Sequence, residues 1–212
     1  MCGRYYLRHS PREIREGLGP DWDWRFPEFP TLGLFNMAPS QEFPVACDVA
    51  GEKAIIARQW GLAPSWLKDP SKAQINARAE TVWEKPMFRH GVHKGRCLVP
   101  ASGWYEWQQS ANGKQPHALA PLDDSLLLFA GIEDNGTYAI LTREATPALA
   151  HVHHRMPCVL SRDAAMAWMS PHDDEAAEAL AMRVLGTFKA WPVSTQVNSP
   201  RNDDPSNIKP ID

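Results

Sequence analysis

The chain has 212 residues, of which 43% are hydrophobic, enough to build one domain around a sizeable core. Its formal net charge of −3 excludes a protein that coats nucleic acid through overall positive charge, so any contact with DNA must come from a local patch. The four cysteines are too widely spaced for a zinc knuckle or a dense disulfide framework.

The distribution of charge is uneven along the chain. Residues 72–96 contain Lys and Arg side chains with only Glu80 and Glu84 as acidic ones, and this stretch is a candidate basic patch. Arg4, Arg8 and Arg12 interrupt any apolar run at the N-terminus, so no signal peptide is expected. No segment approaches the roughly 20 apolar residues of a membrane span. We therefore expect a cytoplasmic protein with reduced thiols, without contact to a membrane.

Helix and strand signals follow one another in short segments. Ser10-Pro11-Arg12-Glu13 is typical of a capping box with Pro at the first helical position, and it predicts a short helix. Strands are predicted at residues 54–60, 96–99, 103–107, 126–132, 138–142 and 158–160. Thr146-Pro147 predicts another short helix, and two more are predicted at 161–169 and 173–185, the last stopped by Gly186.

These strands outnumber the helices and do not alternate with them in a βαβ order. The pattern predicts an α+β fold: one domain over residues 1–212, with a curved, mainly antiparallel sheet or barrel-like core and short peripheral helices. The tail from about residue 198 is rich in Pro, Asn and Asp, and is expected to be irregular.

The second residue offers distinctive chemistry. Removal of Met1 would leave Cys2 with a free α-amine whose pKa is about 7.7–8, far below that of a lysine. Amine and thiol together form a 1,2-aminothiol, which attacks an aldehyde twice and closes a thiazolidine ring. Many chains begin with Met-Cys by chance, however, so this signal is weak by itself and a buried, inert Cys2 is the alternative.

A carboxylate among aromatic rings is the second candidate. In Gly103-Trp104-Tyr105-Glu106-Trp107, burial of Glu106 would raise its pKa, which suits a general acid or base near neutral pH. The alternative is that Glu106 points outward from a half-exposed strand.

Three histidines lie in the segment His151-Val152-His153-His154. No Cys or carboxylate lies nearby at the spacing that a zinc site needs, so a single catalytic histidine is favoured over a metal site, and neither metal nor cofactor is expected.

Several segments together resemble the SOS-response-associated peptidase (SRAP) family, whose members sense abasic DNA. The resemblance extends from residue 2 to about Pro192-Val193-Ser194, with the segments in the family's order. They are Cys2-Gly3-Arg4, Asn36 with Ala38-Pro39, Trp60-Gly61 with Ala63-Pro64 and Trp66, Asn76-Ala77-Arg78-Ala79-Glu80, Gly103-Trp104-Tyr105-Glu106-Trp107, and His153 with Arg155-Met156-Pro157.

The resemblance implies a site that bonds covalently to abasic sites in single-stranded DNA. Cys2 would be the nucleophile and Asn76 would orient it. Glu106 would transfer protons, and His153 would assist opening of the sugar. The implied DNA contacts are Arg4, Arg78 and Arg155 on phosphates, Asn36 and Thr142 as further contacts, and Trp66 and Pro39 beside neighbouring bases.

The resemblance also implies the wider behaviour of the protein. We expect a monomer near the nucleoid or replication fork, with single-stranded DNA and its junctions with duplex as partners. A peptidase activity is expected only as self-processing that frees Cys2, and lyase activity as a side path. Two positions depart from the family pattern: Leu67 stands where a second aromatic residue is common, and His154 where an acidic one is common.

Three other interpretations remain open. An N-terminal-nucleophile amidohydrolase would also begin Met-Cys-Gly and use the Cys2 thiol against an amide. A non-catalytic module that binds single strands would need only Trp66 and the basic stretch. A metalloprotein would use the histidine cluster.

Overall fold

The computed structural model describes residues 2–31, 33–111, 113–170, 174–183 and 186–211. Strands dominate this part of the chain, and they form two sheets. The prediction of an α+β fold with a curved, mainly antiparallel core is confirmed.

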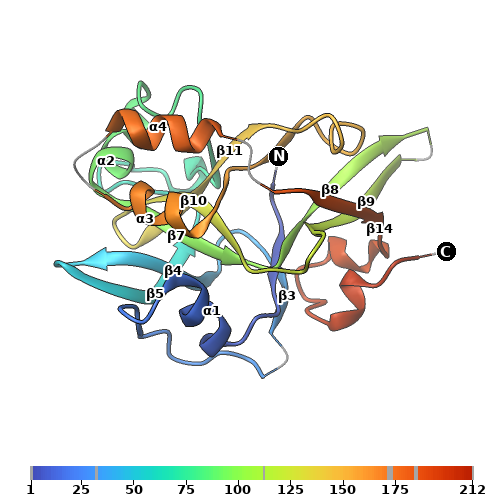
Figure 1. Cartoon of the computed structure of the whole chain (residues 1–212). Helices are drawn as coiled ribbons and strands as arrows, with labels where there is room; N and C mark the ends of the chain where they lie inside the picture. Colours follow the sequence, from blue (N-terminus) through green and yellow to red (C-terminus); the bar gives the residue numbers. More distant parts are fainter. Residues whose placement is uncertain (1, 32, 112, 171–173, 184–185, 212) are drawn as a thin grey trace.

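The first sheet carries the N-terminal strand in its interior. Its order is β14 (Phe188–Pro192), β9 (Gly113–Pro121), β8 (Gly103–Ser110), β1 (Tyr5–Leu7) and β3 (Leu34–Met37), and all neighbours are antiparallel. β8 and β9 form a long hairpin that projects to one side of the molecule (Figure 1), opposite to the side reached by the hairpin of β4 (Glu42–Val49) and β5 (Glu52–Trp60).

The second sheet closes on itself. The main path is β12 (Arg155–Pro157), β11 (Thr137–Glu144), β10 (Leu127–Asp134), β7 (Arg96–Ala101), β4 (Glu42–Val49), β5 (Glu52–Trp60) and β2 (Asp23–Trp24). β13 (Val159–Leu160) pairs with β10, and β6 (Asn76–Arg78) pairs with β11. β11 also pairs in parallel with β5, so the path from β5 through β4, β7 and β10 returns to its start as a barrel.

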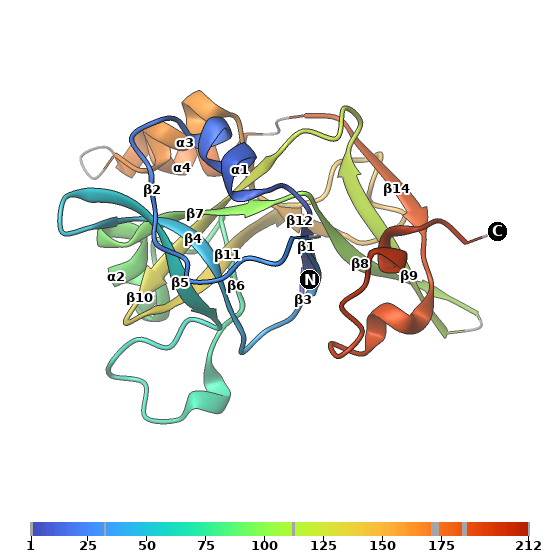
Figure 2. The ribbon, with the colours of Figure 1, turned by 90° about the horizontal axis from the view of Figure 1, so that it is seen from below.

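Tyr5 connects the two sheets. Its ring lies 5.1 Å from that of Trp60 on β5, and its hydroxyl is 2.7 Å from the hydroxyl of Tyr138 on β11. All three side chains are completely buried. Because β1 is fixed against the barrel in this way, the start of the chain lies between the barrel and the β8–β9–β14 part of the first sheet (Figures 1 and 2).

The helices are short and peripheral. α2 (Pro86–Lys94), α3 (Arg162–Trp168) and α4 (Asp174–Met182) gather on one side of the barrel, as Figure 1 shows. α1 (Pro11–Leu18) begins with the predicted capping box, in which the Ser10 amide donates to the Glu13 carboxylate at 2.7 Å. 3-10 turns occupy Pro70–Lys72, Thr195–Asn198 and Pro205–Ile208.

Most local predictions are confirmed, with two corrections. The predicted strands overlap β5, β7, β8, β10, β11 and β13, and the later helices correspond to α3 and α4; residues 173, 184 and 185 lie outside the described part. The helix predicted at Thr146-Pro147 is wrong. The Thr146 carbonyl accepts from the amides of Leu149 and Ala150, and the Leu149 carbonyl accepts from those of Val152 and His153. Among the backbone hydrogen bonds of the described residues, none to the carbonyls of residues 147 and 148 joins these two turns, so they do not form a helix. The tail is not wholly irregular, since Asp204 caps a 3-10 turn.

Candidate functional site

The first strand places Cys2 beside Glu106. Tyr5 lies opposite Trp104 in the β1–β8 ladder, and the Tyr105 amide donates to the Arg4 carbonyl at 3.0 Å. Because the strands are antiparallel, residues before Arg4 continue past Tyr105 toward Glu106. From the barrel side, the Asn76 amide donates to the Cys2 carbonyl at 2.7 Å.

The Cys2 thiol is fully buried. Burial, and secondarily the nearby charge of Glu106, raises the pKa of this thiol well above its ordinary value. The thiol is therefore protonated at neutral pH and is a weak nucleophile until its proton is removed.

Glu106 is buried, as one of the two sequence interpretations expected. Its side chain is 2% exposed, and this burial raises its pKa to about 7. A carboxyl group with this pKa is present in both protonation states at neutral pH, so it can donate a proton in one step and accept one in another.

His153 completes the group of titratable side chains. Its Nδ1 lies 3.8 Å from Oε2 of Glu106 and accepts a hydrogen bond from the Arg155 amide at 3.0 Å. Burial lowers its pKa, so the ring is neutral near pH 7. The ring stacks on His154, with centroids 4.4 Å apart.

A pocket of about 410 Å³ opens beside these groups. Glu106 and His153 line it together with Trp107, Lys114 and Asn198. Cys2, Asn76, Glu106 and His153 come from four separate segments, and the fold brings them together. Lys114 and Asn198 were missed by the sequence analysis, since each is an isolated polar residue outside any motif.

Two of the predicted DNA contacts lie in an internal network. The Arg4 guanidinium donates to Oδ1 of Asn36 at 2.6 Å and to the Val197 carbonyl at 2.8 Å. Asn36 is 2% exposed, and its amide donates to the carbonyls of Ser199 and Asn202 at 2.9 and 2.8 Å. In this structure both side chains attach the C-terminal segment to β1 and β3.

Arg155 and Thr142 are also committed to internal contacts. Arg155 forms a bidentate pair with Glu80, with N···O distances of 2.6 and 2.9 Å. Thr142 is completely buried, and its carbonyl accepts from the same guanidinium. The pairing lowers the pKa of Glu80, which is therefore ionised at neutral pH.

The other predicted contacts are more accessible. Arg78 is exposed at the end of β6, and its side chain forms no hydrogen bond within the described part of the chain. Trp66 is 56% exposed, in the segment between β5 and β6 that projects from the barrel (Figure 2), while Pro39 is half-buried.

A family comparison assigns the chain. The model of the SOS response associated peptidase (SRAP) family matches residues 1–200. The chain belongs to the SRAP family. The family resemblance read from the sequence motifs is thereby confirmed.

Similar proteins span the whole SRAP chain. It is 32% identical to the abasic site processing protein YoaM of Bacillus subtilis, over 96% of this chain and 95% of the relative. It is 37% identical to the abasic site processing protein HMCES of Gallus gallus, over all of this chain and 78% of the relative.

Solved structures share the SRAP fold. A protein from Bacteroides thetaiotaomicron superposes with a TM-score of 0.82 at 22% identity, covering 99% of this chain and all of the other. A phage-related protein from Bordetella bronchiseptica has a TM-score of 0.74 at 28% identity, with 91% and 94% of the two chains covered.

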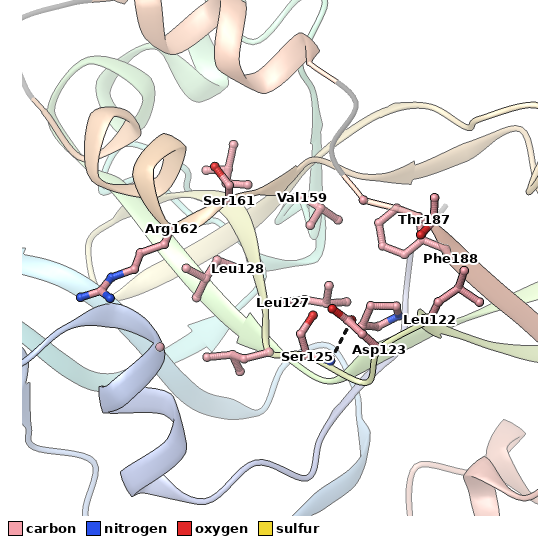
Figure 3. A pocket seen from close by; sticks show the side chains of 15 residues that line it. Leu122, Asp123, Ser125, Leu127, Leu128, Val159, Ser161, Arg162, Thr187 and Phe188 are labelled. Atoms are coloured by element: carbon pink, nitrogen blue, oxygen red, sulfur yellow. Dashed lines mark hydrogen bonds between the residues drawn. The ribbon is translucent and has the colours of Figure 1, made fainter.

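A second hollow of this SRAP chain has a different character. The cleft of about 420 Å³ in Figure 3 lies among the turn between β9 and β10, β13 and β14, and its lining is mainly apolar. The predicted site residues are absent from that lining, and the guanidinium of Arg162 points away from it.

Metal-binding clusters and membrane-spanning helices are both missing from the described residues. Within these ranges, no three His, Cys, Asp or Glu side chains are grouped so as to hold a metal ion. No helix in the described part of this SRAP chain has the length and apolar character needed to cross a membrane.

Proposed function

We propose that this SRAP protein processes abasic sites in single-stranded DNA by bonding to them covalently through Cys2, after removal of Met1. The observation that carries the proposal is the position of Cys2, hydrogen-bonded by Asn76 and lying beside a carboxyl group whose pKa is about 7. The names of the relatives YoaM and HMCES, both abasic site processing proteins, support it.

The buried thiol determines the order of the steps. Because the pKa of the Cys2 thiol is raised, the α-amine is the better first nucleophile at neutral pH, since its own pKa is about 7.7–8. The amine attacks C1′ of the ring-opened sugar and forms a carbinolamine. Protonated Glu106 donates to the departing hydroxyl, and loss of water gives a Schiff base.

Ring closure follows at the same carbon. The ionised Glu106 accepts the thiol proton, sulfur adds to C1′, and the proton passes to the imine nitrogen. The net reaction joins amine, thiol and aldehyde into a thiazolidine with release of one water. His153, 3.8 Å from Glu106, would assist opening of the sugar and reversal of the linkage.

Recognition without a base requires contacts to phosphates and to exposed base faces. Among the three arginines expected to contact DNA, Arg78 is the exposed one and would bind a phosphate. Trp66 and Pro39 would lie against neighbouring bases. The remaining predicted contacts form internal hydrogen bonds in this structure, and they would exchange these partners for DNA when it binds. They are Arg4, Asn36, Thr142 and Arg155.

The remaining expectations complete the proposal. The protein acts as a monomer on single strands and on their junctions with duplex, and it is associated with DNA in the cell. Peptidase activity is confined to freeing Cys2. Elimination from the Schiff base gives lyase activity as a side path.

A denaturing gel tests the covalent reaction. Purified protein, shown by intact mass to have lost Met1, is mixed with a single-stranded oligonucleotide that carries one abasic site. A shifted band that resists heat and detergent is expected, and an oligonucleotide without the lesion serves as control. If no such band forms, the proposal is wrong, and release of ammonia from glutamine becomes the next assay, because it tests Cys2 as an amidohydrolase nucleophile.

Replacing Asn76 with aspartate is expected to slow covalent capture. The substitution keeps the side-chain shape but removes the donor that holds the Cys2 carbonyl at 2.7 Å. A buried acceptor without its partner costs about 1–3 kcal/mol, which corresponds to a rate lower by roughly 5- to 150-fold at saturating DNA. Asn135→Asp, in the turn between β10 and β11, is the matched control, and equal rates for the two variants would contradict a positioning role for Asn76.

Replacing Trp66 with alanine is expected to weaken non-covalent binding. Loss of one stacked base costs about 1–3 kcal/mol, or roughly 5- to 150-fold in Kd. Fluorescence anisotropy with a labelled oligonucleotide, in a Cys2→Ala background, measures this. Leu122→Ala is the control, because Leu122 is similarly exposed, at 59%, on the turn between β9 and β10. Unchanged affinity in Trp66→Ala would exclude stacking at this position.

A further inference from the structure

The pocket beside Glu106 and His153 has a second wall without an assigned role. This wall is formed by Trp107 of β8, Lys114 of β9 and Asn198 of the 3-10 turn Thr195–Asn198. The wall lies at the β8–β9 hairpin, whereas Asn76 and Arg78 approach the site from β6, on the barrel.

Trp107 is held in one orientation. Its indole Nε1 donates to Oδ1 of Asn198 at 2.7 Å, and the side chain is half-buried. An aromatic ring fixed in advance loses little conformational entropy when a flat or apolar group packs against it. The wall therefore offers a rigid surface to whatever enters the pocket.

Lys114 supplies the positive charge. It lies near the tip of the hairpin, opposite Gln109, and is exposed. Within the described ranges its ammonium forms no ion pair or hydrogen bond, so it is available to a ligand. Of the other groups that line the pocket, His153 is neutral near pH 7 and Glu106 carries only part of a negative charge, so the positive charge that the pocket offers to an anion is that of Lys114.

Unlike Lys114, two of the three arginines expected to contact DNA are already bound to partners within the protein. Arg4 donates to Asn36 and Val197, and Arg155 is paired with Glu80, so neither head is free in this structure. Arg78 is accessible, but it lies on the β6 side of the site. A strand that crosses the site carries a phosphate on each side of the reacting sugar, and Lys114 is an accessible cation in the pocket lining on the hairpin side.

We propose that Lys114 binds the backbone phosphate next to the abasic sugar on the hairpin side, and that the fixed ring of Trp107 packs against the nucleotide attached to it. The inference rests on the proposed function and extends it, since it defines a subsite for the flanking nucleotide opposite Arg78. Lys114 binds substrate and does not take part in proton transfer.

Binding of single-stranded DNA to Lys114→Gln tests the subsite. Each neutralised phosphate on a single strand contributes about 0.7 to the slope of log K against log salt concentration, so the variant should lose about 0.7 of slope and roughly fivefold in affinity at 0.1 M salt. Lys53→Gln is the control, because Lys53 is exposed on the β4–β5 hairpin that projects in the opposite direction (Figure 1). Both substitutions are made in the Cys2→Ala background.

Neutral linkages locate the phosphate. Oligonucleotides with one methylphosphonate at successive positions around the abasic site are compared on two chains that differ only by the Lys114→Gln substitution. At one flanking position the neutral linkage should weaken binding to the chain that keeps Lys114 by roughly fivefold and leave the Lys114→Gln variant unaffected.

The outcomes separate this inference from the proposed function. If the wild-type chain forms the covalent band but Lys114→Gln matches Lys53→Gln in affinity and salt slope, the subsite is wrong and the proposed function stands. A second outcome also contradicts the subsite. If Lys114→Gln lowers affinity but every methylphosphonate weakens binding equally in both chains, Lys114 acts through its general charge and binds no particular phosphate. Absence of the covalent band in wild type overturns the proposed function itself.

Discussion

Replacing Cys2 with alanine is expected to eliminate the heat-stable covalent product completely, below the detection limit of a denaturing gel. Alanine still permits removal of Met1, so the α-amine remains while the thiol is lost. The chain would then stop at the Schiff base, which hydrolyses on heating. Borohydride reduction before electrophoresis should recover a band from this variant, and this would separate the amine step from the thiol step.

A second buried cysteine provides the control for this experiment. Cys47 is 1% exposed on β4, and Cys47→Ala removes a buried thiol without touching the site. It should form the covalent product at the wild-type rate. A heat-stable band from Cys2→Ala would contradict the thiazolidine mechanism and would point to a different nucleophile.

The candidate catalytic residues were predictable because their chemistry is carried by local motifs. Cys2 is marked by its position, Glu106 by the aromatic residues around it, and His153 by the segment before Arg155. Whether Glu106 is buried was left open by the sequence, because an outward-facing strand fitted the same residues. Strand alternation could not decide it, since residues 103–106 of β8 are buried on both faces.

The hydrogen-bond partners of the arginine side chains were not predictable from the same motifs. Arg4 is held by Val197, 193 residues away, and Arg155 by Glu80, 75 residues away. Local sequence gives the charge of a side chain but not the partner that occupies it, because ion pairs form between segments that only the completed fold brings together. Lys114 is the converse case, an isolated lysine that gains a role from the pocket beside it.

The fold shows the same division between local and distant information. The capping box of α1 and the strands rich in apolar residues are local signals, and they were predicted. Closure of the barrel depends on the parallel pairing of Tyr138 with Trp60, which no short pattern encodes. The error at Thr146 has a similar origin. The Ala145 amide donates to the His154 carbonyl at 3.0 Å, and this contact closes the loop that a helical start signal alone would have extended.

Replacing Glu106 with glutamine is expected to lower the rate of covalent capture by roughly 10²- to 10⁴-fold and to change its dependence on pH. In the wild-type chain the rate should rise as the α-amine loses its proton and fall as the proton on Glu106 is lost, near its pKa of about 7. The variant has no such proton to lose, so its lower rate should only rise with pH. A falling alkaline limb that persists in Glu106→Gln would assign that limb to another group.

The same substitution lowers the reaction rate but should raise the free energy of unfolding, relative to wild type, at alkaline pH. The pKa of Glu106 is raised from 4.5 to about 7 on folding, so its contribution to stability is complete below pH 4.5 and is lost as pH rises toward 7. Glutamine does not titrate, so the variant does not undergo this loss. The free energy of unfolding of the variant minus that of the wild type should therefore be higher above pH 7 than at pH 4, by on the order of 3 kcal/mol. Urea unfolding at pH 4 and pH 8 measures this, with the exposed Glu28→Gln as control. A difference between variant and wild type that stays constant across this range would mean that Glu106 ionises as readily in the folded chain as in the unfolded one, and the proton transfers assigned to it would then need another residue.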